Sequence, residues 1–525
     1  MNSLIKRFSA APVMWATLLI GALVLFRLVA LILAAPGLGP DEAQYWRWSH
    51  ELDWGYFSKP PLIAWMINAT TSVFGHDEWA VRLYAPLTHG IAAFFLFLLG
   101  RRAYGLSVGG WAAATYILMP GVWLSSGIVS TDGLLLPCIS LALYSLWRQR
   151  EGASWTFAIC LGLAIGLGFL AKYAAIYLVL GIAIVFIIDR PTRRGLLNIR
   201  SLATLVIAAA LITPNIMWNA ANDFATVSHT AENTKWGDAA LNFQHFPEFL
   251  LDQMAVFGPF SFAILIGGLA LILPSTDPES AGKDRWLLSF ILPALIAISI
   301  QAVISRAHAN WAASAYAAGS VLAASWAIRA NWGGLLKFGL VLQFIVGLIF
   351  VSMSISPALA DKAEFANAYK RARGWPQTVE ALRARAEAIG ASEIVFDERE
   401  NWHGLDYYGE RADPQLAERI SLWRRHDAPH SFGESAAPVS DDPTATLLVA
   451  SVRSDFRARE RADFKTFEGL GELVIPLGGG RERRFCLYRA TGYAPLPRTA
   501  EYEAAFRDER EDCSTGPENE PSTDQ

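Results

Sequence analysis

The chain has 525 residues, of which 53% are hydrophobic and only 18% are charged. Soluble proteins carry roughly 25% charged residues, so this composition excludes an ordinary soluble protein and indicates that lipid surrounds much of the chain. The formal net charge of −4 argues against a nucleic-acid partner. The four cysteines are too few for a disulfide framework. Cys486 and Cys513 lie in the polar C-terminal part, where their pairing is an open alternative.

Long apolar runs predict a polytopic α-helical membrane protein. A helix that crosses the hydrocarbon core needs about 20 mostly apolar residues. The first run is too long for the apolar core of a signal peptide, and we interpret it as an anchor that stays in the membrane. About eleven such runs are present, some of them short, near residues 13–35, 83–100, 108–124, 129–147, 155–170, 173–188, 202–218, 255–273, 287–304, 311–328 and 335–355.

Basic residues between these runs predict the orientation of the chain. Short cytoplasmic loops carry an excess of Lys and Arg. With eleven spans, all of the basic clusters fall on one side: Lys6, Arg7, Arg101, Arg102, Arg148, Arg150, Arg190, Arg193, Arg194, Arg200, Lys283, Arg285 and Arg329. The sequence therefore predicts a cytoplasmic N-terminus.

The opposite side of the membrane is expected to hold two loops and the C-terminal part. Residues 1–358 form the predicted transmembrane domain, whose outside loops are 36–82 and 219–254. Residues 359–505 mix apolar and charged side chains, which is typical of a small extracytoplasmic α/β domain. The polar residues 506–525 are expected to be disordered.

Short patterns predict the elements of that C-terminal domain. Residues 362–388 are expected to form a helix that is interrupted at Pro376. The predicted strands are the apolar segments 394–396, 447–450 and 485–488.

Two adjacent carboxylates, Asp41 and Glu42, directly follow the first predicted span. Charges at the membrane interface are costly unless they face water or a site. A solvated loop is the plain alternative for an acidic pair. Here, however, an aromatic, amphipathic stretch follows, and within it a Lys-Pro-Pro turn fixes Lys59 near headgroup depth. A lysine in that position suits a lipid phosphate, which it binds as a point charge.

Three further charged residues lie at predicted span ends. Asp132, in Ser-Thr-Asp-Gly, is either a helix N-cap or a second carboxylate facing the same cavity, and the two roles are compatible. Lys172 interrupts the apolar stretch 155–188 and predicts a turn on the outside, where a tolerated charge favours donor phosphate binding. Arg82 opens the second span and either reaches the same phosphate or is a snorkelling interfacial arginine.

Two later outside segments contain histidines. His229 and Glu232 have the i, i+3 spacing that can hold a metal on a helix, but only two ligands are visible, so a divalent metal is an unsupported alternative. Arg306, His308 and Asn310 are suited to binding phosphate or sugar hydroxyls, with a plain loop as the alternative.

These residues together resemble a known family. The run Asp41-Glu42, Tyr56-Phe57-Ser58-Lys59-Pro60-Pro61 and Val81-Arg82-Leu83 is similar to bacterial glycosyltransferases of the protein-mannosyltransferase-like family. That family belongs to the GT-C superfamily and includes the lipid A aminoarabinose transferase. Weaker matches follow downstream, and the resemblance covers roughly residues 10–350: they are Ser130-Thr131-Asp132, Phe169-Leu170-Ala171-Lys172 and Pro214-Asn215-Ile216-Met217-Trp218-Asn219.

The resemblance implies the GT-C fold and an inverting sugar transfer from a polyprenyl-phosphate donor, such as an undecaprenyl-phosphate sugar, without a soluble cofactor. Asp41 would be the general base or would orient the acceptor nucleophile, and Glu42 would support the acceptor or the sugar. Lys59 would neutralise the leaving phosphate, and Tyr56 would stack on or hydrogen-bond the donor.

The resemblance also implies the partners and the location. The acceptor would be an envelope glycolipid or glycan such as lipid A or lipopolysaccharide core, or less commonly a protein, at the periplasmic face of a bacterial inner membrane. A lipid or sugar transporter and a non-catalytic assembly protein are the rival hypotheses. The sequence shows no internal repeat, which weakens the transporter hypothesis.

Overall fold

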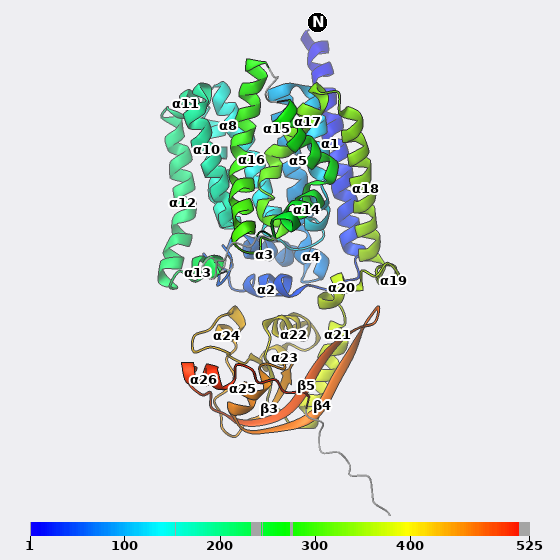
Figure 1. The fold of residues 1–525 in the computed structure, drawn as a ribbon, viewed down its shortest axis with the longest axis vertical. Helices are drawn as coiled ribbons and strands as arrows, with labels where there is room; N and C mark the ends of the chain where they lie inside the picture. The colour runs from blue at the N-terminus through cyan, green and yellow to red at the C-terminus, as the bar shows by residue number, and fades with distance from the viewer. Residues whose placement is uncertain (1, 153, 233–242, 244, 273–276, 514–525) are drawn as a thin grey trace, which may run out of the picture. The chain divides into compact units, whose positions relative to one another are not determined.

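The computed structural model describes residues 1–525 except 1, 153, 233–242, 244, 273–276 and 514–525. Contacts between residues divide the chain into two compact units (Figure 1). The helical unit comprises Met1–Ala34 and Glu51–Ser352. The C-terminal unit comprises Ala35–His50 and Met353–Gln525, so a short N-terminal segment belongs to it.

Apolar helices build the first unit. Within the described residues five helices are long and apolar enough to cross a membrane, or up to seven if each of two bent pairs is one span. The predicted count of about eleven spans is therefore not confirmed. The long spans are Val13–Leu33 in α1 (Asn2–Leu33), Glu78–Tyr104, α12 (Arg200–Ala221), α16 (Pro278–Ile304) and α18 (Gly333–Ile355).

The remaining helices of this unit are shorter or bent. Residues Glu78–Tyr104 consist of α4 (Glu78–Arg82) and α5 (Tyr84–Tyr104). The other helices are α3 (Leu62–Phe74), α6 (Leu106–Ile117), α7 (Pro120–Ser125), α8 (Asp132–Glu151), α9 (Trp155–Ala171), η1 (Tyr173–Ala175), α10 (Ile176–Ile188), α11 (Arg190–Leu196), α13 (Ala225–Glu232), α14 (His245–Phe257), α15 (Pro259–Leu271), η4 (Ala309–Ala312) and α17 (Ala315–Arg329).

Small residues allow these helices to pack closely. Between α5 and α6, a Cβ on Gly100 would lie 3.0 Å from the Cα of Gly109. Between α9 and α12, a Cβ on Gly162 would lie 2.8 Å from the carbonyl oxygen of Thr204. Close backbone approach of this kind is how helices associate in lipid, where burial of apolar surface gives no preference for a neighbouring helix.

A β-sheet forms the core of the C-terminal unit. Its strand order is β2-β1-β3-β5-β4. The parallel strands are β1 (Glu393–Phe396), β2 (Ile420–Leu422) and β3 (Thr446–Ser451), and the antiparallel strands are β4 (Phe464–Gly478) and β5 (Arg481–Tyr493). Side chains alternate between the two faces, so that Ile394 and Phe396 pack in one cluster and Val395 packs in another. The three predicted strands lie within β1, β3 and β5, which confirms the small C-terminal domain with its sheet.

The expected helix at 362–388 is wrong in its bounds. The chain instead forms α19 (Pro357–Lys362), α20 (Ala366–Tyr369), η5 (Lys370–Ala372) and α21 (Trp375–Ala388). Pro376 lies in the first turn of α21 rather than inside a longer helix. Proline suits that position because the N–H that it lacks would have no partner within the helix.

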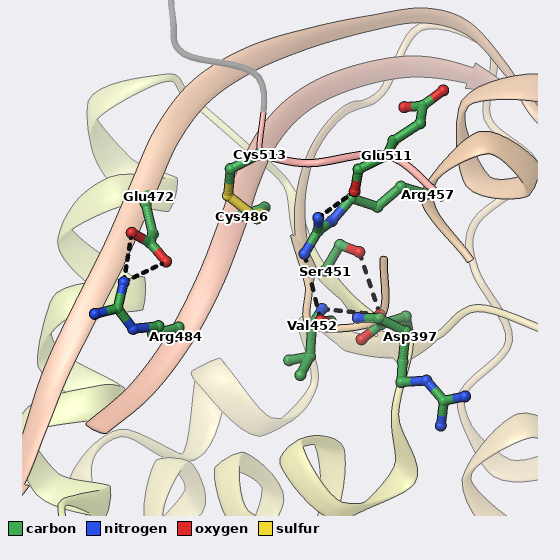
Figure 2. The surroundings of a disulfide bond; sticks show 10 residues. Asp397, Ser451, Val452, Arg457, Glu472, Arg484, Cys486, Glu511 and Cys513 are labelled. Atoms are coloured by element: carbon green, nitrogen blue, oxygen red, sulfur yellow. Dashed lines mark hydrogen bonds and ion pairs between the residues drawn. A yellow bond between two sulfur atoms is a disulfide. The ribbon is translucent and has the colours of Figure 1, made fainter. Parts of the chain in front are cut away.

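A disulfide joins the C-terminal segment to the sheet (Figure 2). Cys486 on β5 is bonded to Cys513, with a Cα–Cα distance of 5.3 Å. The pairing that the sequence left open is therefore present. The disorder expected from residue 506 onward stays a prediction for 514–525, which lie outside the described residues.

Candidate functional site

The acidic pair lies on α2 (Pro40–Trp48), a helix of the C-terminal unit. Pro40 at its first position fits the helix start, and Asp41 and Glu42 in the first turn complement the positive end of its dipole. Glu42 is buried, and its Oε2 accepts a hydrogen bond from the Gly39 N–H at 2.8 Å. Asp41 instead exposes 63% of its side chain and forms an ion pair with Arg399 at 3.4 Å. The two carboxylates therefore differ: Glu42 caps its own helix, and Asp41 faces outward.

Helix α22 (Arg399–Ala412), in the same unit, fixes the position of α2. The Trp46 ring packs edge-on against Tyr407, with the centroids 4.7 Å apart. The Tyr408 hydroxyl accepts a hydrogen bond from the Leu38 N–H at 2.8 Å. Arg47 lies 3.6 Å from the buried carboxylate of Asp406. Apolar, polar and charged contacts thus hold the helix that carries Asp41.

Lys59 and Tyr56 lie on a tight loop of the helical unit. The Tyr56 N–H donates to the carbonyl of Lys59 at 3.1 Å. The Tyr56 hydroxyl donates to the carbonyl of Glu51 at 2.9 Å and accepts from the N–H of Asp53 at 3.1 Å. Burial raises the pKa of Tyr56 to about 12, so the phenol is neutral at physiological pH. Its hydroxyl shapes the loop that presents Lys59, and the predicted contact of Tyr56 with the donor stays a prediction.

The outer end of α12 and the following helix α13 clamp this loop. The Asn215 Nδ2 donates to the carbonyl of Trp54 at 2.6 Å, and the Trp218 Nε1 donates to Asp53 at 2.5 Å. The Gly55 backbone lies against the indole of Trp218, where a Cβ would come within 2.3 Å of the ring. Any larger residue at position 55 would displace the loop.

Asp132, Lys172 and Asn310 meet in the helical unit. Lys172 is the extended residue between α9 and η1, and its Nζ lies 2.8 Å from the Asp132 Oδ1. Asn310, in η4, donates from Nδ2 to the Asp132 Oδ2 at 2.6 Å. Asp132 is buried, whereas 21% of the Lys172 side chain is exposed. The structure therefore brings three of the predicted site residues together and contains the predicted turn at Lys172.

The N-cap role expected for Asp132 is wrong. The N-cap of α8 is Thr131, and Asp132 is the first residue of the helix. Its carboxylate binds Lys172 and Asn310, while the Ser130 Oγ accepts a bond from the Gly133 N–H at 3.3 Å.

The positive charge of Lys172 affects the nearby His308. Its ring contacts Trp311 edge-on at 5.2 Å. Burial first, and then the positive charges of Arg306 and Lys172, lower the pKa of His308. The imidazole is therefore neutral at pH 7 and can accept a hydrogen bond from a sugar hydroxyl. Arg306 and His308 are both exposed, and the shift in the pKa of His308 shows that Arg306 and Lys172 lie within electrostatic range of it.

Arg82 is the last residue of α4 and only 5% of its surface is exposed. A snorkelling arginine needs an exposed head group, so that alternative is wrong for Arg82. Donor binding by Arg82 stays a prediction. The metal alternative at His229 and Glu232 concerns side chains outside the described residues.

The sequence analysis gave no role to two sets of polar residues that the structure brings together. The Tyr173 hydroxyl donates to the Asn215 Oδ1 at 2.9 Å and accepts from the Asn219 Nδ2 at 3.0 Å. This network joins the turn at Lys172 to the helix that clamps the Lys59 loop. The available signal was the i, i+4 pair Asn215 and Asn219 inside an apolar run, because that spacing puts both amides on one helix face.

The second set lies under the start of α8. His89 is completely buried, with its Nδ1 2.9 Å from the Tyr116 hydroxyl and its Nε2 3.0 Å from the Ser125 Oγ. The Ser125 Oγ lies 2.8 Å from the Ser130 Oγ, two residues before Asp132. No local pattern marks these residues, because α5, α6 and α7 each supply one of the first three.

Comparisons with known proteins relate parts of this chain to sugar transferases. The family model described as "Dolichyl-phosphate-mannose-protein mannosyltransferase" matches residues 58–218. This range includes Lys59, Arg82, Asp132 and Lys172, whereas Asp41 lies outside it.

Two curated relatives give more specific similarities. The "Lipid A galacturonosyltransferase RgtD" of Rhizobium johnstonii is 36% identical over 296 residues, which cover 56% of this chain and 62% of that protein. The "Undecaprenyl phosphate-alpha-4-amino-4-deoxy-L-arabinose arabinosyl transferase 1" of Pseudomonas fluorescens is 30% identical over 213 residues, 37% of this chain and 38% of that protein. The matched segment spans less than two thirds of either relative.

A solved structure shares the fold. The crystal structure of ArnT from Cupriavidus metallidurans bound to undecaprenyl phosphate aligns with a TM-score of 0.62 at 15% identity. The alignment covers 92% of this chain and 99% of that one. The predicted GT-C architecture, a helical membrane part followed by a small domain with a sheet, is thereby confirmed.

Proposed function

We propose that this chain, a membrane protein that belongs to the GT-C glycosyltransferase family, transfers a sugar from a polyprenyl-phosphate donor to an acceptor in the cell envelope. The acceptor is lipid A, lipopolysaccharide core or a related glycoconjugate. Two relatives support these classes, since one is named for lipid A and the other for an undecaprenyl-phosphate donor. The reaction takes place at the periplasmic face of a bacterial inner membrane.

The observation that carries this proposal is the arrangement around Lys172. A lysine at a turn between two apolar helices is costly unless it has a function or a partner. Asp132, which Asn310 binds in turn, holds this lysine in place, yet 21% of the lysine side chain stays exposed. Arg306 and His308 add further polar groups that suit a phosphate and a sugar.

The transfer breaks the bond between the anomeric carbon and the lipid phosphate, and forms a bond from that carbon to an acceptor oxygen. The leaving phosphate gains negative charge, which Lys59, Lys172 and Arg306 stabilise. Asp41 takes the proton of the acceptor hydroxyl as the new bond forms. Its exposed carboxylate is accessible to an acceptor, whereas the Glu42 carboxylate is occupied with its helix start.

Two features support the orientation. Basic residues lie on the predicted cytoplasmic side of the spans. The Cys486–Cys513 disulfide suits an oxidising compartment, where such bonds persist. Together they favour a periplasmic C-terminal unit.

The test uses the purified full-length protein in proteoliposomes that contain lipid A. Undecaprenyl-phosphate aminoarabinose and undecaprenyl-phosphate galacturonate are supplied as donors, and mass spectrometry measures the product. We expect lipid A to gain one sugar from one of the donors, and Asp41→Asn to abolish the gain. Asp441→Asn, which neutralises an exposed carboxylate elsewhere in the C-terminal unit, is the matched control. Movement of the donor across the bilayer without any product would favour a transporter instead.

A further inference from the structure

We propose that Arg399 is a positioning residue for Asp41, and that the C-terminal unit takes part in the reaction through it. This inference rests on the proposed function, because it assigns Asp41 the role of base. It also assigns a role to the C-terminal unit, for which the sequence predicts no role.

The first support is the fold. Helix α2 is separated from the rest of the C-terminal unit by some 300 residues of the chain, yet it belongs to that unit by its contacts. The backbone leading to it is tied there as well, because the Ala35 N–H donates to the Ser354 carbonyl and the Gly37 N–H donates to the Ala372 carbonyl, both at 2.9 Å. Asp41 is thus held by the C-terminal unit.

The second support is the geometry of the guanidinium. One terminal nitrogen of Arg399 donates to the Gln44 Oε1 at 2.9 Å, and the other lies 3.4 Å from the Asp41 Oδ1. Asp41 and Gln44 are three residues apart and share one face of α2. Gln44 is only 2% exposed, so the amide that anchors Arg399 is itself fixed. A planar guanidinium held at one end presents its other end to Asp41 in a set direction.

The third support is the arrangement of neighbouring charges. The two residues that flank Arg399 in sequence are acidic, and each is paired elsewhere. Glu398 lies 3.5 Å from Arg453, and Glu400 lies 3.1 Å from Arg371. Arg399 is therefore the member of this run that faces α2.

Stability does not account for this contact. The side chains of Asp41 and Arg399 are 63% and 44% exposed, and exposed ion pairs contribute on average ~0–1 kcal/mol. An exposed aspartate without a partner samples several rotamers. The contact of Arg399 with the Asp41 Oδ1 restricts the rotamers of Asp41. The rest of the carboxylate stays exposed and accessible to the acceptor.

The test compares three variants of the full-length protein in the lipid A assay. We expect Arg399→Ala to lower kcat ~10-fold or more, as misplacement of a catalytic group does, with the donor KM within about twofold of wild type. Arg399→Lys should lower kcat less than Arg399→Ala does. Lysine keeps the positive charge but lacks the two terminal nitrogens with which the guanidinium contacts Gln44 and Asp41. Arg371→Ala removes the neighbouring exposed arginine, and we expect it to leave kcat unchanged.

Thermal unfolding separates positioning from folding. The melting temperatures of the three variants should lie close to that of the wild type. A kcat of Arg399→Ala within twofold of wild type would overturn the inference while leaving the proposed function intact. Equal kcat losses in Arg399→Ala and Arg371→Ala, or a loss that follows the melting temperature, would also overturn it. A wild-type protein without transfer would refute the proposed function and the inference together.

Discussion

Lys172 donates to Asp132 across 2.8 Å, from the turn between α9 and η1 to the first residue of α8. The pair is asymmetric, because the carboxylate is buried and the ammonium is partly exposed. A buried carboxylate holds the lysine at an otherwise apolar turn, and the exposed part of the ammonium remains available to an anion. The lysine therefore combines a fixed position with access to a ligand.

The first prediction follows from this asymmetry. Lys172→Met should lower kcat/KM ~10²-fold, mainly through a higher donor KM, because the variant loses a charge that the phosphate meets before and during transfer. Steady-state kinetics with graded donor concentrations check the result. Lys283→Met is the control, since Lys283 pairs with Glu279 at 2.8 Å in the first turns of α16. An unchanged donor KM in Lys172→Met would contradict a role in phosphate binding.

The second prediction concerns Asn215. Its side chain bonds Tyr173, beside Lys172, and also Trp54, in the loop that carries Lys59. Asn215→Asp keeps an acceptor for the Tyr173 hydroxyl but loses the donor to the Trp54 carbonyl. The variant should be destabilised by ~1–3 kcal/mol, the usual cost of an unsatisfied buried group, and its donor KM should rise.

The control for Asn215 lies at the end of the same helix. Asn222 is exposed and donates to the Trp218 carbonyl at 2.8 Å. Asn222→Asp should leave both the stability and the donor KM near their wild-type values. If Asn215→Asp lowers the melting temperature with no change in donor KM, Asn215 serves the fold alone.

The sequence predicts residues better than it predicts their relationships. Lys172 and Asp132 could be selected because a charge in an apolar run is conspicuous, and Asn310 because it follows Arg306 and His308 at a span end. Their pairing could not be predicted, because it depends on how α8, α9 and η4 pack. The contacts of His89 could not be predicted either, because they also depend on helix packing. In the structure this buried histidine links Tyr116 to Ser125.

The division of the chain shows a further limit. Residues 36–82 look like one loop, because they follow one span and precede another. In the structure, α2 joins the C-terminal unit, whereas α3 and α4 join the helical unit. Arg399 is 358 positions away from Asp41, so no local pattern could predict their contact.

The third prediction concerns the pH dependence of stability in the C-terminal unit. Asp397, directly after β1, is buried and accepts a hydrogen bond from the Val452 N–H at 2.8 Å (Figure 2). It also accepts one from the Arg453 N–H at 2.7 Å. Burial raises the pKa of Asp397 from 3.8 to about 6, and the nearby Glu398 adds to the shift. The unfolded chain therefore loses this proton at lower pH than the native protein does. Stability is highest below about pH 3.8 with respect to this group, and falls as the pH rises toward about 6.

Asp397→Asn removes that titration and retains an oxygen that can accept the backbone bonds. The difference in unfolding free energy between variant and wild type should shift in favour of the variant between about pH 4 and 6, and stay constant above. Thermal unfolding at several pH values measures this difference. The buried His403, whose pKa burial lowers, is present in both proteins. Burial and the charge of Asp397 raise the pKa of the buried Glu460, so both proteins carry Glu460→Gln to remove this second titration. A difference that is independent of pH would contradict the prediction.

The fourth prediction uses the cysteines to test the orientation. Cys486 and Cys513 are bonded, whereas Cys138 and Cys160 are free. If the C-terminal unit is periplasmic, the protein made in cells with an oxidising periplasm should carry this bond. A thiol-reactive polymer, added after denaturation, should then attach to two cysteines without reductant and to four after reduction, and a gel separates the products.

Replacing one of the two bonded cysteines tests how much the disulfide contributes to stability. Cys513→Ser opens a loop of 27 residues, which in the chain-entropy model costs roughly 3 to 4 kcal/mol of stability. The loss should appear as a lower unfolding temperature, and Cys160→Ser, which alters a free cysteine, should not reproduce it. Labelling of four cysteines in the unreduced wild type would place the C-terminal unit in a reducing compartment. In that case the active face would be cytoplasmic, and the basic residues would have predicted the wrong orientation.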